Sequence, residues 1–132
     1  MSERIRRLEE NIVTLEEMRT QPAIGRQSEW ALRYGLLESI QIVIDLACEL
    51  VSRRNLGSPT SYRECVEILA RNRLIDEALA QSLVGMVGLR NLLVHDYDEI
   101  DIQRLTQLLD RLSDFREFSA CYLRIINDET RA

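Results

Sequence analysis

The sequence predicts an all-α protein, a bundle of about five helices, and two observations lead to this fold class. Apolar residues recur at alternating spacings of three and four along most of the 132 residues, which is the period of one face of an α-helix. Two prolines and five glycines leave few of the turns that a sheet protein needs, so few and long elements are expected. The length suits a single domain with its own core, over residues 1–132.

A short connection around a proline joins the first two predicted helices. From about Glu3 to Thr20 the apolar residues form one stripe, and Gln21-Pro22 should end that helix. The second helix should run over about 28–54, with Ser28 as its N-cap, and is the longest in the chain. Its apolar surface is wider than one stripe, which indicates a central position in the bundle or a subunit interface.

Four side chains of the second helix differ from its aliphatic pattern. Trp30 and Tyr34 lie one turn apart, and we expect them to pack in the core or at a dimer contact rather than to stack on bases. Asp45 and Glu49 also lie one turn apart. We expect them to be polar groups of a subunit interface and to face the polar motif described below.

The third predicted helix is short and follows the clearest loop of the chain, residues 55–59. A glycine suited to a helix C-terminus and a proline that prevents continuation mark this loop. Ser61, with Glu64 three residues later, has the spacing of a capping box for a helix that ends near Asn72.

Two further helices complete the predicted bundle. The fourth contains Gly85 and Gly88, which each cost about 1 kcal/mol relative to alanine. We therefore expect another helix to approach closely there, or a bend in the chain. The last helix should begin after Asp98 or Asp101 as its cap and continue without a break to about Asn127.

The charge balance excludes a protein that holds nucleic acid tightly by electrostatics alone. The chain has 17 basic and 22 acidic residues, for a formal charge of −5, and lacks lysine. Nucleic-acid binders usually show a basic excess, because neutralising phosphates supplies much of their affinity. A local cleft lined by arginines remains compatible with this composition.

The cysteines predict a reducing environment. Cys48, Cys65 and Cys121 are odd in number, far apart and without a CxxC pair, and with a single histidine they argue against a structural zinc site. Each lies among apolar neighbours, so we expect buried free thiols. The N-terminus lacks an apolar signal core and the chain lacks a membrane span, which together favour a cytoplasmic location.

Polar chemistry is concentrated in residues 90–97, where the fourth helix should end. The stretch contains Arg90, Asn91, the only histidine, His95, and Tyr97. On a regular helix Arg90 and His95 point about 140° apart around the axis. They can share one pocket only if the helix ends or distorts between them, or if two chains contribute.

Arginine and histidine without a metal or cofactor support a narrow chemistry. A histidine can give or take a proton near neutral pH, and an arginine presents a rigid fork to phosphate oxygens. RNA carries its own nucleophile, the 2′-hydroxyl, so a base, an acid for the leaving oxygen and a cation for the developing charge would suffice for cleavage to a 2′,3′-cyclic phosphate. Two symmetry-related histidines can supply the base and the acid. From spacing alone, however, a histidine at a helix C-terminus is more often a dipole-stabilising cap, and a helical arginine usually pairs with a carboxylate.

A family resemblance favours the catalytic interpretation. The stretch Gly88-Leu89-Arg90-Asn91-Leu92-Leu93-Val94-His95-Asp96-Tyr97 resembles the signature of the HepT-like branch of HEPN domains, whose core pattern is Arg, a polar residue, three more residues and His-x-Tyr. Other segments resemble the family in the same order along the chain: Trp30 to Leu50, Leu56-Gly57-Ser58-Pro59, Ser61-Tyr62-Arg63-Glu64 and Ile68-Leu69-Ala70.

The resemblance implies a dimeric, up-and-down HEPN bundle that is the toxin of a type II toxin–antitoxin system. It implies an endoribonuclease in which Arg90 and His95 of both subunits line one cleft, with Asn91 orienting the substrate or Arg90. The implied partner is a minimal nucleotidyltransferase antitoxin, which inactivates such a toxin by transferring AMP units from ATP to the motif tyrosine, here Tyr97. RNA is the implied substrate, and no DNA substrate is expected.

The charges around the motif leave other function classes open. Four carboxylates near it would oppose a polyanion unless they point away: Asp96, Asp98, Glu99 and Asp101. The opposing positive charge would have to come from a few arginines, such as Arg53, Arg54, Arg71, Arg73 and Arg90. A non-catalytic helical module that docks a nucleotidyltransferase, and a plain helical scaffold subunit, are the alternatives.

Overall fold

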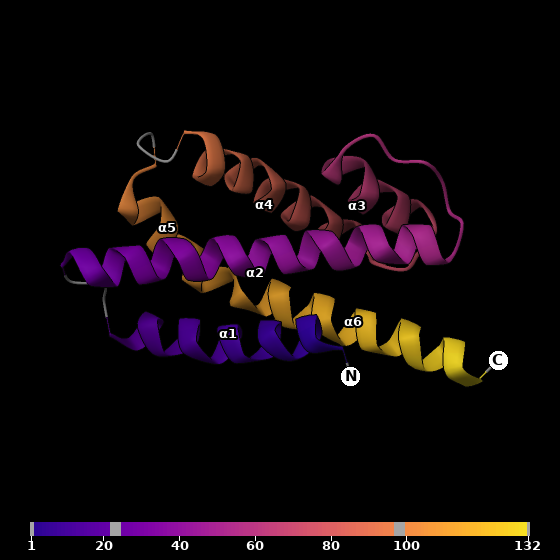
Figure 1. The fold of residues 1–132 in the computed structure, drawn as a ribbon, viewed down its shortest axis with the longest axis horizontal. Helices are drawn as coiled ribbons and strands as arrows, with labels where there is room; N and C mark the ends of the chain where they lie inside the picture. The colour runs from indigo at the N-terminus through magenta and orange to yellow at the C-terminus, as the bar shows by residue number, and fades with distance from the viewer. Residues whose placement is uncertain (1, 22–24, 97–99, 132) are drawn as a thin grey trace.

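The helices pack side by side in a bundle, with α2 (Arg26–Arg53) running through the middle (Figure 1). The computed structural model describes residues 2–21, 25–96 and 100–131. Within these ranges every regular element is helical, so the all-α prediction is confirmed. Of the helices described, none combines the length and the hydropathy needed to cross a bilayer.

α1 (Glu3–Thr20) and α2 form a helical hairpin. The Oγ atom of Ser2 caps α1 by accepting a hydrogen bond from the backbone N–H of Ile5 at 3.3 Å. The predicted cap of α2, Ser28, is wrong. The helix begins two residues earlier, after Gly25, whose φ of 87° turns the chain in a way that glycine adopts at little cost.

α3 (Tyr62–Arg71) and α4 (Glu77–His95) form a second pair above α2 in the view of Figure 1. The capping box is confirmed on its first side, since the Oγ atom of Ser61 accepts from the backbone N–H of Glu64 at 3.1 Å. The Glu64 carboxylate accepts in return from the backbone N–H of Thr60, also at 3.1 Å. α4 ends at His95, where the polar run was expected to stop it.

The last predicted helix is divided, contrary to the prediction. α5 (Ile102–Leu108) leads through a 3₁₀ turn, η2 (Leu109–Arg111), into α6 (Leu112–Arg131). Leu105, Leu109 and Leu112 are all buried across the break. The three leucines stay in the core through this tighter turn, and neither proline nor glycine signals it in the sequence.

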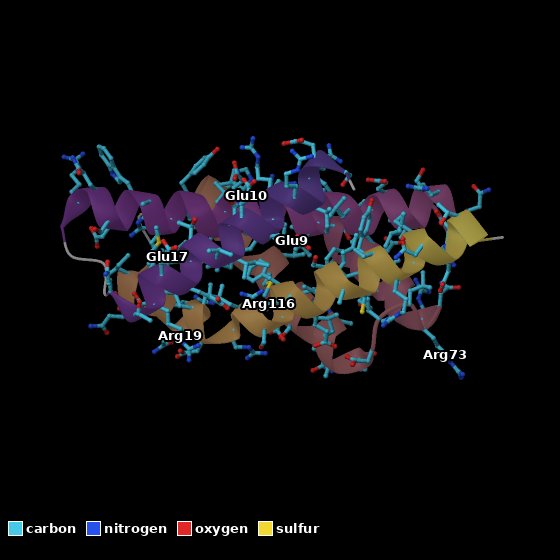
Figure 2. The ribbon with its side chains drawn as sticks, turned by 90° about the horizontal axis from the view of Figure 1, so that it is seen from below. Glu9, Glu10, Glu17, Arg19, Arg73 and Arg116 are labelled. Carbon is cyan, nitrogen blue, oxygen red and sulfur yellow. A yellow bond between two sulfur atoms is a disulfide. The ribbon has the colours of Figure 1, made fainter. Side chains whose placement is uncertain are left out.

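α1 lies along α6 on the lower side of the bundle, and Figure 2 shows this face. Arg116 of α6 forms an ion pair with Glu16 at 2.7 Å, and Arg19 of α1 pairs with Asp110 at 3.3 Å. These pairs are half-exposed, so each contributes little to stability. The aliphatic core beneath them, with Phe115 and Phe118 fully buried, holds the helices together.

Trp30 and Tyr34 are not in the core. Their side chains are 59% and 65% exposed, and they lie on one face of α2. Arg26 lies over the Trp30 ring at 4.6 Å from its centroid, and the Tyr34 hydroxyl donates to Glu38 at 2.9 Å. The prediction of core packing is therefore wrong, and the alternative, a dimer contact, stays a prediction.

Gly85 and Gly88 do not mark a close approach of another helix. A Cβ atom built on either glycine would meet no heavy atom within 4 Å outside the helix's own backbone. α4 continues unbroken through both positions. The two glycines instead leave open space on the surface of α4.

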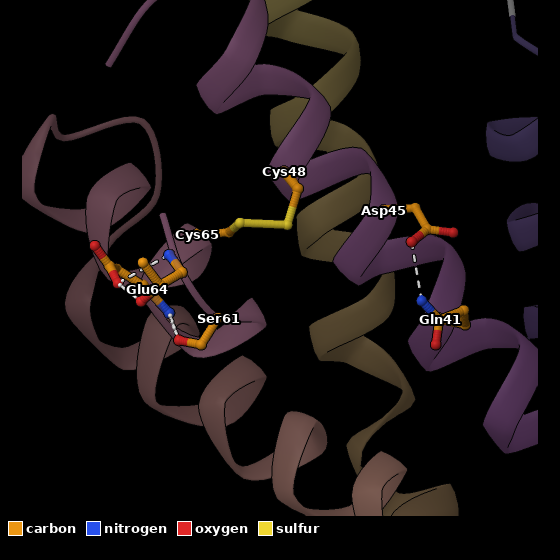
Figure 3. Close-up of a disulfide and its surroundings, with 7 residues drawn as sticks. Gln41, Asp45, Cys48, Ser61, Glu64 and Cys65 are labelled. Carbon is orange, nitrogen blue, oxygen red and sulfur yellow. Dashed lines mark hydrogen bonds between the residues drawn. A yellow bond between two sulfur atoms is a disulfide. The ribbon is translucent and has the colours of Figure 1, made fainter. Parts of the chain in front are cut away.

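Two of the three cysteines form a disulfide, so the prediction of three free thiols is wrong. Cys48 of α2 and Cys65 of α3 are joined, with 5.2 Å between their Cα atoms (Figure 3), whereas Cys121 is free and buried. The loop of residues 55–59 folds α3 back against α2 and so brings the two thiols together. Because disulfides are uncommon in reducing compartments, this pair does not support the cytoplasmic prediction.

Candidate functional site

Arg90 is held to α2 by a hydrogen bond to Gln41, which is itself held by Asp45 of the same helix. Its Nε atom donates to Oε1 of Gln41 at 2.9 Å, and Nε2 of Gln41 donates to Oδ1 of Asp45 at 2.9 Å. Figure 3 shows Gln41 and Asp45 on successive turns of α2. Asp45 thus faces the motif, as expected, and orients the Gln41 amide so that its oxygen accepts from Arg90.

Glu49, the other acidic residue of this pair, faces elsewhere. Its carboxylate accepts from the Tyr122 hydroxyl at 3.2 Å and pairs with Arg53 at 3.3 Å, both away from Arg90. Burial and the nearby Glu49 charge raise the pKa of Tyr122. The expectation that Glu49 faces the motif is wrong.

The half-buried guanidinium of Arg90 has two further neighbours. Its Cζ atom lies 5.1 Å from the ring centroid of Tyr62, within the range of a cation–π contact. Its Nη1 atom donates to Oδ1 of Asn91 at 3.1 Å, the contact expected of a residue that orients Arg90. N–H groups on both Nη atoms remain for an anion such as a phosphate.

His95 is the last residue of α4 and is exposed. The backbone N–H of Asp96 donates to the carbonyl of Leu92 at 2.8 Å and closes the final turn. The helix therefore ends after His95 and not between His95 and Arg90. Within one chain the two side chains start about 140° apart around the axis, so a second chain is the remaining way to combine them.

The carboxylates near the motif are only partly described. Asp96 is exposed, and Asp101 turns toward its own helix, where its side chain accepts from the backbone N–H of Gln103 at 3.0 Å. Tyr97, Asp98 and Glu99 lie outside the described residues.

Most of the arginines considered as a source of positive charge lie elsewhere. Arg53 and Arg54 both pair with Glu129 of α6, at 2.8 and 3.1 Å. Arg71 is exposed on α3, and Arg73 extends away from the bundle (Figure 2). Of the five arginines considered, Arg90 is therefore the one that lies at the motif.

A pocket of about 780 Å³ opens between α2, α3 and α4, and two of the residues that contact Arg90, Tyr62 and Asn91, line it. We call it the Tyr62 pocket. Its lining includes Cys48, Tyr62, Cys65, Val87, Gly88 and Asn91. Within the described ranges, no group of three or more His, Cys, Asp or Glu side chains is arranged to hold a metal ion.

Two partners of Arg90 were not identified from the sequence. In the sequence Gln41 is a polar residue within the second predicted helix, and Tyr62 is part of the segment that resembles the family. A glutamine on an otherwise apolar stripe is a weak signal of a buried hydrogen-bond partner, and the sequence contains nothing that pairs it with Arg90.

Comparisons with known proteins agree with the resemblance. A family model described as "Ribonuclease HepT-like" matches residues 1–121. The chain is 33% identical over 109 residues to the mRNA nuclease HepT of Shewanella oneidensis, covering 76% of this chain and 82% of that protein.

Two solved structures share the fold at 26% identity. One is a tri-AMPylated HEPN toxin of Shewanella oneidensis in complex with MNT antitoxin, with a TM-score of 0.83 over 92% of this chain and 97% of that chain. The other is a toxin–antitoxin structure with AMP-PNP, with a TM-score of 0.82 over 89% and 92%. With the family match and the helical architecture in place, the chain belongs to the HepT-like ribonuclease family.

Proposed function

We propose that this protein is the toxin of a type II toxin–antitoxin system and cleaves RNA without a metal ion, at a site built from Arg90 and His95 of two subunits. The anchored Arg90 is the observation that carries the proposal. Gln41, Tyr62 and Asn91 hold its guanidinium and leave N–H donors for a phosphate, and Tyr62 and Asn91 also line a pocket. The similarity of the chain to an mRNA nuclease also supports the proposal.

Exposed apolar side chains beside the motif support a homodimer. Trp30, Tyr34 and Val94 are 59%, 65% and 43% exposed, and Tyr34 and Val94 line a small hollow together with Gln41. Large exposed aromatic side chains are common at protein interfaces. A two-fold axis near this surface would bring the two α4 ends together, and with them Arg90 and His95 of both chains.

The chemistry needs one base, one acid and a cation. His95 of one subunit takes the proton of the RNA 2′-hydroxyl, and the 2′-oxygen attacks the adjacent phosphorus. The bond from phosphorus to the 5′-oxygen breaks, and that oxygen receives a proton from His95 of the other subunit. Arg90 stabilises the charge that develops on the phosphate oxygens. The products are a 2′,3′-cyclic phosphate and a 5′-hydroxyl.

A nucleotidyltransferase antitoxin is the proposed partner, and the cytoplasm the proposed location. The tri-AMPylated toxin with its MNT antitoxin supports this partner by similarity. Tyr97 is the proposed acceptor, because it follows His95 by two residues and completes the motif. AMP units on its hydroxyl would add bulk and negative charge two residues from His95 and repel the RNA phosphate.

RNA cleavage by the wild type and three variants tests the catalytic part. Arg90→Ala and His95→Ala should each lose at least about a hundredfold in rate, in the range of general acid–base and electrostatic contributions. Arg104→Ala removes an exposed arginine outside the motif and should keep the wild-type rate. Equal activity in all four proteins would contradict the assignment and leave a non-catalytic docking module.

Intact mass tests the modification. After incubation with the partner nucleotidyltransferase and ATP, the wild type should gain AMP units, and Tyr97→Phe should gain none. Tyr34→Phe, which alters an exposed tyrosine elsewhere, serves as the matched control and should be modified like the wild type.

A further inference from the structure

We propose that the Tyr62 pocket binds one unpaired nucleobase of the RNA, next to the phosphate held by Arg90. This inference rests on the proposed function and adds a substrate-binding subsite to it. The pocket would determine which nucleotides are cut and hold the RNA strand in register.

The pocket has apolar walls and polar edges. Val84 and Val87 of α4 line one side, and the joined sulfur atoms of Cys48 and Cys65 line another. Ser61 contributes a polar group at the edge. Such a lining suits a flat, uncharged ring with hydrogen-bonding edges, and the volume of about 780 Å³ is ample for one base.

Two residues that line the pocket, Tyr62 and Asn91, also contact the phosphate-binding group, Arg90. Tyr62 lines the pocket with a side chain that is 37% exposed, and the Arg90 guanidinium lies over its ring. Asn91 also lines the pocket, and its amide oxygen accepts from Arg90, which leaves its two N–H groups as donors. A phosphate on Arg90 would thus place the attached nucleoside at the mouth of the pocket.

This arrangement favours a nucleotide over an apolar protein side chain as the occupant. An aliphatic side chain would use the walls but leave the cation and the amide donors at the rim without partners. A nucleotide uses both, because its base is flat and apolar on its faces while its phosphate is anionic. Single-stranded RNA is commonly recognised in this way, by bases that are unstacked and held against aromatic or arginine groups.

Gly88 keeps the pocket open and makes the inference testable. It lines the pocket, and a Cβ atom there would meet nothing within 4 Å, so a larger side chain at this position extends into empty space. Gly85 offers the same substitution on the same helix, also into open space, but it does not line this pocket. Leucine favours a helix more than glycine does, so both variants should fold.

The experiment measures RNA binding. The strongest cleavage site of the wild type in total RNA is mapped, and 12-nucleotide RNAs around it are made non-cleavable by a 2′-O-methyl group at the scissile position. In a second set, one nucleotide on either side of the scissile phosphate lacks its base. Removal of one of these two bases should weaken binding to the wild type about tenfold.

Gly88→Leu should weaken binding of the intact RNA by a similar factor and bind the abasic RNA as the wild type does. Gly85→Leu should match the wild type with both RNAs. Both variants should have melting temperatures no lower than the wild type. The loss from the variant and the loss from the missing base should not add, because both remove the same contact.

The outcomes separate the two proposals. If Arg90→Ala abolishes cleavage but neither the abasic RNAs nor Gly88→Leu changes binding, the proposed function stands and the subsite is wrong. Additive losses would place the base outside the pocket and overturn the inference. If the wild type cleaves no RNA, the proposed function and the inference fall together.

Discussion

Arg90 of α4 is tied to Gln41 of α2, with 2.9 Å between the arginine Nε and the glutamine Oε1. Gln41 is in turn held by Asp45, which accepts from its amide nitrogen at 2.9 Å and so keeps the amide oxygen turned toward Arg90. The direction of the proposed phosphate-binding group is therefore set by a neighbouring helix and not by its own helix alone.

Gln41→Ala should lower the rate of RNA cleavage about tenfold, because losing one hydrogen bond to a charged group costs about 1 to 3 kcal/mol and frees the guanidinium to move. Single-turnover cleavage rates measure this. Asp45→Asn keeps an oxygen that can accept from Gln41 and should retain most of the activity. The control is Gln107→Ala, at an exposed position of α5. A rate for Gln41→Ala equal to that of the wild type would show that Gln41 does not position Arg90.

Cys48→Ser should destabilise the oxidised protein by about 3 kcal/mol, the value for a cross-link that closes a loop of this size. The two cysteines are 17 residues apart and join α2 to α3. Urea unfolding with and without dithiothreitol measures the effect. Reductant should bring the wild type close to the variant and leave the variant unchanged.

Cys121→Ser is the matched control, since Cys121 is buried and unpaired. Its unfolding midpoint should still fall on reduction, as the wild type's does. If the unfolding midpoint of the wild type does not change when reductant is added, the disulfide does not stabilise the fold.

Glu38→Gln should reduce stability at neutral pH by about 1 kcal/mol, with a difference that vanishes in acid. Asn11 donates to the Glu38 carboxylate at 2.9 Å, and with the Tyr34 hydroxyl and the Arg7 charge it lowers the pKa of Glu38 below its usual value of 4.5. A carboxylate whose pKa is lowered by folding stabilises the fold at pH values above its usual pKa. This contribution is lost as the pH falls below 4.5 toward the folded-state pKa.

Thermal unfolding of the wild type and Glu38→Gln between about pH 3 and about pH 7 checks this dependence. These limits lie on either side of the ordinary glutamate pKa. Glu10→Gln, at an exposed position of α1, removes the same charge without these partners and should show little difference at any pH. A constant gap between the wild type and Glu38→Gln across the range would contradict the titration.

Trp30→Ala should weaken the proposed homodimer at least about tenfold, because a large aromatic side chain at an interface commonly contributes more than 1 kcal/mol. Light scattering over a dilution series measures the dimer dissociation constant. Val13→Ala changes an exposed apolar residue of α1, 52% exposed, and should leave the dimer intact. A wild type that is monomeric at all concentrations would argue against the two-chain site.

The sequence by itself determined the all-α fold class and the motif. The three- and four-residue spacing of apolar side chains predicted the helical ranges, because burial of one face is a local consequence of the helix period. The spacing of Ser61 and Glu64 predicted a cap, because a capping box is formed by hydrogen bonds between residues three apart in the sequence. The motif from Arg90 to Tyr97 is a contiguous stretch, so its family resemblance needed no knowledge of packing.

Only the tertiary structure decided which distant residues meet. Gln41 and Arg90 are 49 positions apart, and their contact depends on how α4 crosses α2. The pairing of Cys48 with Cys65, the exposure of Trp30 and the open space at Gly88 likewise depend on which helix faces cover one another. Helix period specifies an apolar face but not its partner. Packing of the whole core decides which helix faces meet. It thereby also decides the direction of Arg90 and the shape of the Tyr62 pocket.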